Sequence, residues 1–247
     1  MEGIIKAVCI SEKRGTVKKN INEVNVIKDF GLEGDAHAGK WHRQVSFLSA
    51  DIVDEFNEKG ASVIEGDFGE NILAYGIDFK KLPVGTKLIC NDAKFEITQI
   101  GKECHSHCEI YKRVGDCIMP REGIFAKVLE SGTIKVGDKI EVIYPEKDMP
   151  YMAAVMTLSD KGSRGERVDT SGPRAAEILK EHGFKIVEEI ILPDEEAQIK
   201  KHLIRLSDSR QVDLIITTGG TGLSPRDRTP EATLAVADRN VPGISEA

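Results

Sequence analysis

The sequence has no long apolar run and no excess of basic charge. No stretch approaches the roughly 18 consecutive apolar residues that a membrane-spanning helix needs, and the N-terminus lacks the charged-then-apolar pattern of a signal peptide. The 34 lysines and arginines are outnumbered by 41 aspartates and glutamates. We therefore expect a cytoplasmic protein that binds neither a membrane nor nucleic acid.

The sequence has few cysteines, and their number is odd. Five cysteines in a reducing compartment argue against a disulfide framework. What is present is the balance of a soluble folded protein, with 40% hydrophobic and 30% charged residues and no biased tract. A length of 247 residues suits two ordinary domains.

A short polar segment with two prolines, residues 144–150, predicts the boundary between a domain at 1–146 and a domain at 150–247. Before it, β-type runs are separated by Gly and Asp turns. These runs are residues 4–10, 45–48, 87–90, 94–100 and 139–143. With one helix at 49–59, they predict a mostly-β, barrel-like domain.

After the boundary, strands and helices alternate. The expected strands are 153–158, 185–192 and 212–218, and the expected helices are 173–181, 195–206 and 230–238. Residues 214–216 are continuously apolar, which is typical of a central parallel strand covered on both faces. The pattern predicts a doubly wound, three-layer α/β domain that binds ligands at the carboxyl ends of its strands.

A glycine-rich turn in residues 217–233 joins the last of these strands to a helix. Glycines let the backbone approach an anion closely, and Thr229 is a suitable N-cap before Pro230. Arg226 and Arg228 flank Asp227, so arginines could grip phosphate while the carboxylate holds a metal ion. A glycine-rich turn with solvated surface charges is the alternative. The candidate binding residues are Thr218, Gly219, Gly220, Thr221, Gly222, Arg226 and Thr229.

The whole string resembles the signature of the MoaB/MogA molybdopterin-binding family. Further motifs follow in order at residues 158–160, 169–172, 192–195 and 241–243. The resemblance implies that molybdopterin and a nucleotide bind at the strand ends. It also implies that enzymatic members transfer adenylate from Mg-ATP to the terminal phosphate of molybdopterin, or serve molybdenum insertion, and that the domain forms trimers or higher homo-oligomers.

By position in the motifs, Asp194 and Asp227 match the acidic residues that the family needs for catalysis, as metal ligands or charge-positioning groups. Ser159, Asp160, Ser171 and Gly172 fall on its binding loops. Helix capping is the alternative role for Asp194 and for these loop residues. Family domains continue beyond the Pro-Gly motif at 242–243, so we expect the domain to be incomplete at Ala247. A non-catalytic carrier of molybdopterin or of the finished cofactor is therefore the alternative function.

The N-terminal half holds loops dense in glycine and polar residues, at 31–46 and 66–72. Cys104 lies beside Lys102 and His105, which could lower the pKa of its thiol and make it a nucleophile or sulfur carrier. Zinc is the alternative ligand of this region, although the spacing is not a standard paired one. Its candidate ligands are Cys104, His105, His107, Cys108 and Cys117. Cys9 and Cys90 are expected to be buried apolar filler.

These loops, with residues 117–125 and 136–138, resemble the MOSC domain. The resemblance implies a β-barrel-containing fold that binds molybdenum cofactor or carries sulfur on a cysteine, and Cys104 is the matching position. A sulfur donor or a molybdoenzyme would then be a partner, and binding of molybdenum or pyridoxal phosphate is a further implied property. Arg43 and Arg121 are candidate cofactor contacts, with solvated surface arginine as the alternative.

Overall fold

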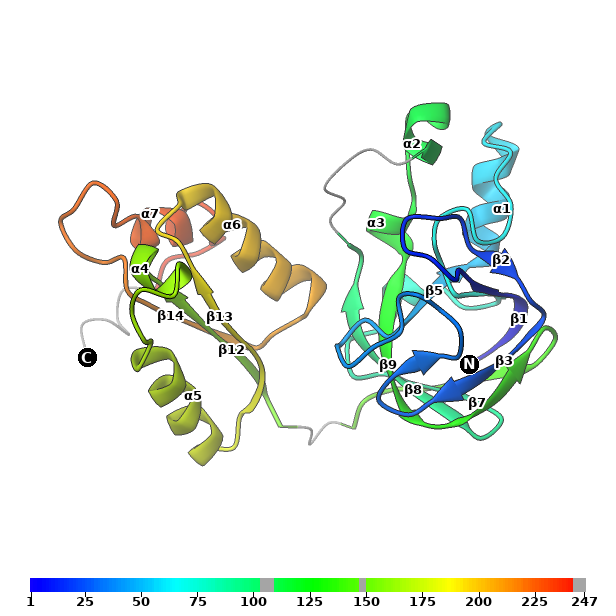
Figure 1. Cartoon of the computed structure of the whole chain (residues 1–247), viewed down its shortest axis with the longest axis horizontal. Coiled ribbons are helices and arrows are strands. Elements are labelled where there is room, and N and C mark those ends of the chain that lie inside the picture. Colours follow the sequence, from blue (N-terminus) through cyan, green and yellow to red (C-terminus); the bar gives the residue numbers. More distant parts are fainter. Residues whose placement is uncertain (103–108, 147–149, 242–247) are drawn as a thin grey trace. The chain divides into compact units, whose positions relative to one another are not determined.

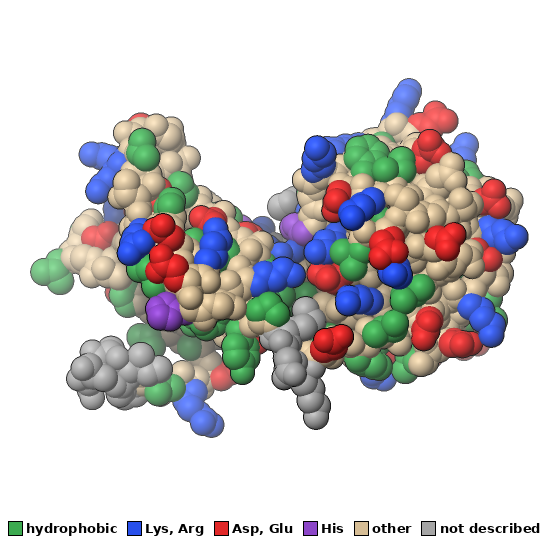
Figure 2. All heavy atoms as spheres, turned by 90° about the horizontal axis from the view of Figure 1, so that it is seen from below, with side chains coloured by type: hydrophobic (Ala, Val, Ile, Leu, Met, Phe, Trp, Pro, Cys, Tyr) green, Lys and Arg blue, Asp and Glu red, His purple; other side chains and the backbone are tan. Residues whose placement is uncertain are grey.

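The computed structural model describes residues 1–102, 109–146 and 150–241, and the chain divides into two compact units, Met1–Lys147 and Asp148–Ala247 (Figure 1). None of the helices among the described residues is long and apolar enough to cross a membrane. In Figure 2, basic and acidic side chains are interspersed over the visible face of the N-terminal unit, which is on the right of the picture.

The N-terminal unit is a closed barrel, as the sequence predicts. Its strands follow one another in the order β1, β6, β5, β9, β8, β7 and β11, and β11 pairs back with β1 through Gly3 and Ile140. Neighbours are antiparallel except β5 and β6. Closure leaves the barrel without a free sheet edge. The strands are β1 (Glu2–Ile10), β5 (Val45–Ser49), β6 (Ile72–Tyr75), β7 (Lys87–Cys90), β8 (Ala93–Ile100), β9 (Ile124–Glu130) and β11 (Lys139–Ile143).

Smaller elements surround the barrel. The short β2 (Lys19–Asn20) extends β1, and a separate sheet joins β10 (Gly132–Lys135), β3 (Glu23–Ile27) and β4 (Gly31–Leu32). The helices are α1 (Ala50–Glu58), η1 (Phe79–Lys81), α2 (Glu109–Val114) and α3 (Met119–Glu122). The expected helix at 49–59 is thus present as α1.

Two hydrophobic cores hold this unit together. One fills the barrel around Phe47, Phe79 and Phe95, whose rings are in contact. The other lies under α1, where Phe56 packs against Phe68. Cys90 belongs to the first core and Cys9 to the second. Both side chains are buried, so the prediction that they are buried apolar filler is confirmed. Burial also raises the pKa of both thiols to about 12.

The C-terminal unit is a parallel three-stranded sheet with strand order β13, β12, β14. The strands are β12 (Met152–Leu158), β13 (Lys185–Leu192) and β14 (Leu214–Thr218). The helices are α4 (Asp160–Ser163), α5 (Ser171–Glu181), α6 (Glu196–Ile204), its π-helical continuation η2 (Arg205–Ser209), and α7 (Thr229–Leu234). The α/β prediction is confirmed, but the expectation that residues 214–216 form the central strand is wrong. Within the described residues β12 is central, and β14 is a half-buried edge strand.

The strand order indicates where on this sheet a ligand is expected to bind. The chain moves from β12 to β13 through α5, then returns past β12 to β14 through α6. Right-handed crossovers in opposite directions put the two connecting helices on opposite faces of the sheet. Met156 and Leu158 pack on Leu203 and Leu206 from the α6–η2 segment. The carboxyl ends on either side of β12 are therefore the place where a ligand is expected.

Candidate functional site

A single carboxylate, that of Asp160, ties together the loops that follow β12, β13 and β14. The backbone N–H of Asp160 donates to Asp194 Oδ2 at 3.0 Å, and the N–H of Asp194 donates back to Asp160 Oδ1 at 3.1 Å. Arg226 donates to the same carboxylate through Nε at 3.0 Å and Nη2 at 2.7 Å. The hydrogen bonds from Arg226 hold the pKa of Asp160 below its usual value. The guanidinium expected to grip phosphate is thus paired with Asp160 in this structure.

Two glycines bring the loop after β14 against its neighbours. Gly219 has φ +90°, and a Cβ there would overlap the carbonyl oxygen of Leu158. Gly220 has φ +61°, and a Cβ there would overlap Thr229 Oγ1 and lie 2.8 Å from Asp194 Oδ1. Only glycine combines this conformation with this close approach. Both positions were expected to bind ligand through such an approach.

Two buried oxygens face this turn without a partner. Asp194 Oδ1 and Thr229 Oγ1 have no hydrogen bond within the part of the chain that the structure describes. The prediction that Thr229 is an N-cap is wrong, because α7 starts at Thr229 and its N-cap residue is Arg228. Asp194 does not cap α6 either, since Glu195 holds that position. Because an unpaired buried oxygen is costly, the two atoms mark a place where a ligand or ion would be stabilised.

Asp169 organises the neighbouring loop before α5. Its carboxylate accepts from Thr157 Oγ1 at 2.6 Å and from the backbone N–H and the hydroxyl of Ser171, each at 3.0 Å. Gly172 also donates its N–H, at 3.2 Å, and a Cβ on it would overlap Asp169. Burial tends to raise the pKa of Asp169, but these hydrogen bonds outweigh it and lower the pKa. Asp169 thus fixes the wall of a cavity.

That cavity has a volume of about 180 Å³ at the strand ends. Of the residues that the sequence predicts, Ser159, Ser171 and Gly219 line it. Ser159 also caps α4 by accepting from the N–H of Gly162. The structure adds lining residues that sequence reasoning missed, notably Thr157 and Arg167. The other candidates belong to the same loops but do not line the cavity: Asp160, Gly172, Thr218, Gly220, Thr221, Gly222, Arg226 and Thr229.

Asp227 lies in the turn of the same loop. Its carboxylate accepts from the N–H of Ser224 at 3.3 Å, and a Cβ on Gly222 would come 2.7 Å from it. No set of three or more His, Cys, Asp or Glu side chains among the described residues is arranged to hold a metal ion. A metal at Asp194 or Asp227 would therefore take its other oxygens from water, hydroxyl or backbone groups, or a substrate phosphate, as Mg²⁺ commonly does.

The N-terminal unit has a larger cavity, of about 600 Å³. Its wall combines aromatic side chains, among them Trp41, Phe68 and Phe125, with basic ones. The basic residues are Lys18, Arg43 and Lys102, together with His37, whose pKa is lowered by burial. Asp67 is the sole acidic residue among those described in the lining. This wall suits an anionic ligand that also offers a flat apolar face.

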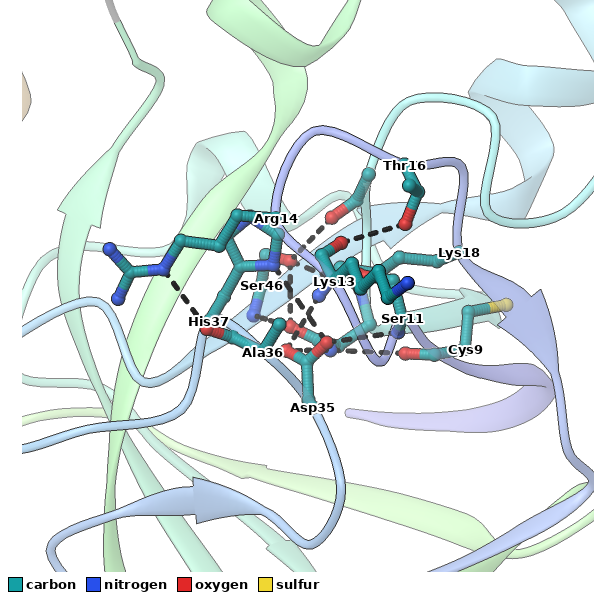
Figure 3. A network of polar contacts seen from close by, with 12 residues as sticks. Cys9, Ser11, Lys13, Arg14, Thr16, Lys18, Asp35, Ala36, His37 and Ser46 are labelled. Carbon is teal, nitrogen blue, oxygen red and sulfur yellow. Dashed lines mark hydrogen bonds and ion pairs between the residues drawn. The ribbon is translucent and has the colours of Figure 1, made fainter.

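A buried polar network supports the wall of this cavity (Figure 3). Asp35 accepts from Lys18 Nζ at 2.8 Å, from the N–H of Ser11 at 3.1 Å and from Asn71 Nδ2 at 3.1 Å. Asn71 in turn accepts from the N–H and hydroxyl of Ser46. Burial tends to raise the pKa of Asp35, but the contacts with Lys18, Asn71 and Ser11 together outweigh it and lower the pKa. Asp35 is therefore ionised and fixed in place.

The two arginines expected to contact cofactor differ in position. Arg43 lines the cavity, and its guanidinium stacks over Trp41 at 4.7 Å and Phe125 at 5.5 Å from the ring centres. Arg121 does not line it, and binds Asp116 at 2.8 Å and 2.9 Å. Of the expected zinc ligands, Cys117 is buried in the cavity wall. Cys104, His105, His107 and Cys108 lie outside the described residues.

Glu70 is a further buried acid, and sequence reasoning missed its setting. Its Oε1 accepts from the N–H of Gly66 at 2.6 Å, while Oε2 has no partner among the described residues. Desolvation raises the pKa of Glu70 to about 7. The loop that it holds, residues 66–69, lines the 600 Å³ cavity.

Comparison with protein families finds a match for each of the two domains. A family described as "Probable molybdopterin binding domain" matches residues 154–247, and the MOSC domain family matches residues 34–141. The chain joins a MOSC domain to a MoaB/MogA-like domain. The cavity of the MOSC domain and the strand ends of the MoaB/MogA-like domain are thus separate candidate sites.

The curated relatives match the MoaB/MogA-like domain. Molybdopterin adenylyltransferase of Helicobacter pylori is 43% identical over 94 residues, which are 37% of this chain and 53% of that protein. The Escherichia coli protein of the same name is 42% identical over 95 residues, 37% of this chain and 48% of that protein. Molybdenum cofactor biosynthesis protein B of Bacillus cereus is 36% identical over 92 residues, 37% of this chain and 53% of that protein. The chain spans about half the length of these relatives.

Solved structures add a fold likeness. The YUAD protein of Bacillus subtilis superposes with a TM-score of 0.51 at 20% identity, over 59% of this chain and 98% of that chain, which shows a shared fold alone. MoaB of Thermus thermophilus is 48% identical over 39% of this chain and 60% of that chain, with a TM-score of 0.38.

Proposed function

We propose that the chain works in molybdenum cofactor biosynthesis, with molybdopterin bound at the strand ends of the MoaB/MogA-like domain and adenylyl transfer from Mg-ATP as its reaction. The observation that carries the proposal is the turn at Gly219 and Gly220, which approaches Leu158 and Asp194 where only glycine fits. Similarity to molybdopterin adenylyltransferases over this domain supports it.

The residues at this turn suit a phosphate-bearing ligand with a divalent cation. Among the residues that the structure describes, Asp194 Oδ1 and Thr229 Oγ1 have no partner, and they are oxygens of the kind that Mg²⁺ prefers, so the donor set fits the ion. When bound, Mg²⁺ supplies charge neutralisation on phosphate oxygens. The chain's own contribution is to hold the loops after β12 and β13 together through Asp160 and Asp194, and to leave the glycine backbone of the turn open to a phosphate.

Arg226 provides a second charge for the site. Its pair with Asp160 is half-exposed and therefore weak enough for a phosphate group to compete with it. A phosphate that displaces Asp160 would gain a bidentate contact with the guanidinium. In this proposal Arg226 moves from the carboxylate to the substrate when the site fills.

For the MOSC domain we propose binding of the pterin cofactor in the 600 Å³ cavity. The aromatic and basic lining supports this role, with the guanidinium of Arg43 in contact with the rings of Trp41 and Phe125. Sulfur carriage by Cys104 is a further part of the proposal that follows from its position after Lys102. A sulfur donor should then leave a persulfide on Cys104 that cyanide releases, and labelling confined to another cysteine would contradict it.

The adenylyl-transfer proposal is tested by incubating the purified chain with molybdopterin and Mg-ATP and measuring adenylylated molybdopterin. We expect Asp227→Asn to lower turnover by at least ~100-fold while pterin binding is retained, because the carboxylate that would hold Mg²⁺ against the reacting phosphate is lost. Glu195→Gln, in the neighbouring loop, is the matched control. Undiminished turnover of the Asp227 variant would refute its role. Binding without turnover in the wild type would favour the carrier function instead.

A further inference from the structure

Lys18 is a buried cation at the wall of the MOSC cavity, and within the described residues it has a single hydrogen-bond partner. Its side chain is 3% exposed and lines the cavity. An ammonium group carries three N–H donors. Within the described residues, Asp35 Oδ2 is the sole acceptor that Lys18 Nζ reaches, at 2.8 Å. Two donors therefore remain on a charge that is removed from bulk water.

The two side chains at the centre of the network, Asp35 and Asn71, are fully engaged, and Ser11 Oγ, which has no partner within the described residues, forms no hydrogen bond with Lys18. The Asp35 carboxylate is taken by Ser11, Lys18 and Asn71. Both polar atoms of the Asn71 side chain are engaged as well, the oxygen by Ser46 and the nitrogen by Asp35 and the carbonyl oxygen of Cys9. The network fixes Lys18 in one place and leaves it short of acceptors.

From this geometry we infer that the inner wall of the MOSC cavity is an oxyanion subsite, with Lys18 as the binding residue and Asp35 as its positioning residue. An oxyanion presents several acceptor oxygens, and can take both remaining N–H groups of Lys18 while it meets Arg43 on the same wall. Phosphate and molybdate share this chemistry. The inference deepens the proposed cofactor binding, because the oxyanion is either the phosphate group of a pterin or a free inorganic ion.

The chain's single tryptophan reports on this cavity. Trp41 lines it, so a ligand that enters should change the tryptophan fluorescence, whereas binding to the other domain should not. The full chain is titrated separately with sodium molybdate, sodium phosphate and molybdopterin. Lys18→Met is compared with Lys13→Met, a substitution of an exposed lysine earlier in the same segment.

We expect Lys18→Met to weaken the fluorescence-detected binding at least tenfold for every probe that the wild type binds, and Lys13→Met to leave it within twofold. Saturation by molybdate or phosphate identifies a free ion, and saturation by molybdopterin alone identifies the pterin phosphate. Equal affinity of the wild type and Lys18→Met for the bound probe overturns the inference. So does a wild type whose fluorescence responds to none of the three, even if the adenylyl-transfer proposal holds.

Lys18→Met leaves Asp35 as an uncompensated buried charge and could prevent folding. The double variant Lys18→Met with Asp35→Asn removes both charges and keeps a hydrogen-bonding side chain at position 35. We expect it to fold, as judged by circular dichroism, and to lose oxyanion binding to the same extent. Retained binding in the folded double variant would equally overturn the inference.

Discussion

Asp160 and Asp194 exchange hydrogen bonds: each backbone N–H donates to the carboxylate of the other, at 3.0 Å and 3.1 Å. The pair locks the loop after β12 to the loop after β13, and Arg226 adds the loop after β14. The geometry of the strand-end site in the MoaB/MogA-like domain therefore depends on one small carboxylate cluster.

The first prediction concerns this lock. Asp160→Ala removes the acceptor of the Asp194 N–H, so hydrogen exchange at that amide should speed up by roughly tenfold or more, since bonds to charged groups contribute about 1.5–3 kcal/mol. Glu166→Ala removes an exposed partner of Arg164 nearby and is the control. Unchanged protection of the Asp194 amide in Asp160→Ala would show that the two reciprocal hydrogen bonds between Asp160 and Asp194 do not hold the loops together.

The glycine turn gives the second prediction. Gly220→Ala should abolish molybdopterin binding by the MoaB/MogA-like domain and destabilise it by about 1–3 kcal/mol, because the new methyl meets Thr229 and Asp194 and φ is positive. Gly165→Ala shares a positive φ of +73° but has nothing within 4 Å. It should cost only about 1 kcal/mol and leave binding intact. Similar binding losses in both variants would mean that conformation matters, rather than close approach.

The third prediction uses the pKa of Glu70. Its value of about 7, against 4.5 for the exposed group, means that the folded state keeps the proton longer than the unfolded state. The contribution of Glu70 to the free energy of unfolding of the MOSC domain should be largest below pH 4.5 and fall as the pH rises to about 7, by up to about 3 kcal/mol. Denaturation followed by Trp41 fluorescence measures it. Glu70→Gln should remove this slope, and an identical slope in the variant would refute the assignment.

The fourth prediction separates the two arginines that the sequence offers as cofactor contacts. Arg43→Met should weaken ligand binding in the MOSC cavity by roughly tenfold or more, because it removes a charge stacked on two aromatic rings of the wall. Arg121→Met should leave the affinity for the ligand unchanged, since Arg121 pairs with Asp116 and does not line the cavity. Fluorescence titration on Trp41 compares them, and the reverse order would count against this assignment of the cavity.

Much of the fold could be predicted from the sequence. β7, β11 and β13 have the bounds that the apolar pattern predicts, because β-type composition and flanking glycines mark them. β6 was missed because its residues are buried on both faces, Ile72 and Ala74 in the barrel and Leu73 in the second core. Such a strand shows no polar alternation. The prediction from the apolar run 214–216 was wrong for a different reason: β14 is an edge strand in this structure, but its composition is typical of a central strand.

The sites were only partly predictable. Motifs located the glycine turn, Asp194 and Arg43, since each belongs to a continuous stretch of sequence. Lys18 was missed because it stands beside Lys19 in a polar stretch, which is typical of solvated surface. Its burial depends on Asp35, which is distant in sequence, meets Lys18 only in the folded barrel and is itself held by Asn71. Arg167 reaches its cavity wall through loop packing in the same way.

The number of molybdopterin molecules that one chain binds tests the account most directly. Equilibrium titration should reveal two sites, of which Gly220→Ala removes one and Arg43→Met weakens the other, with the Trp41 signal following only the second. A chain that binds no molybdopterin, or a single site that neither substitution affects, would contradict the account.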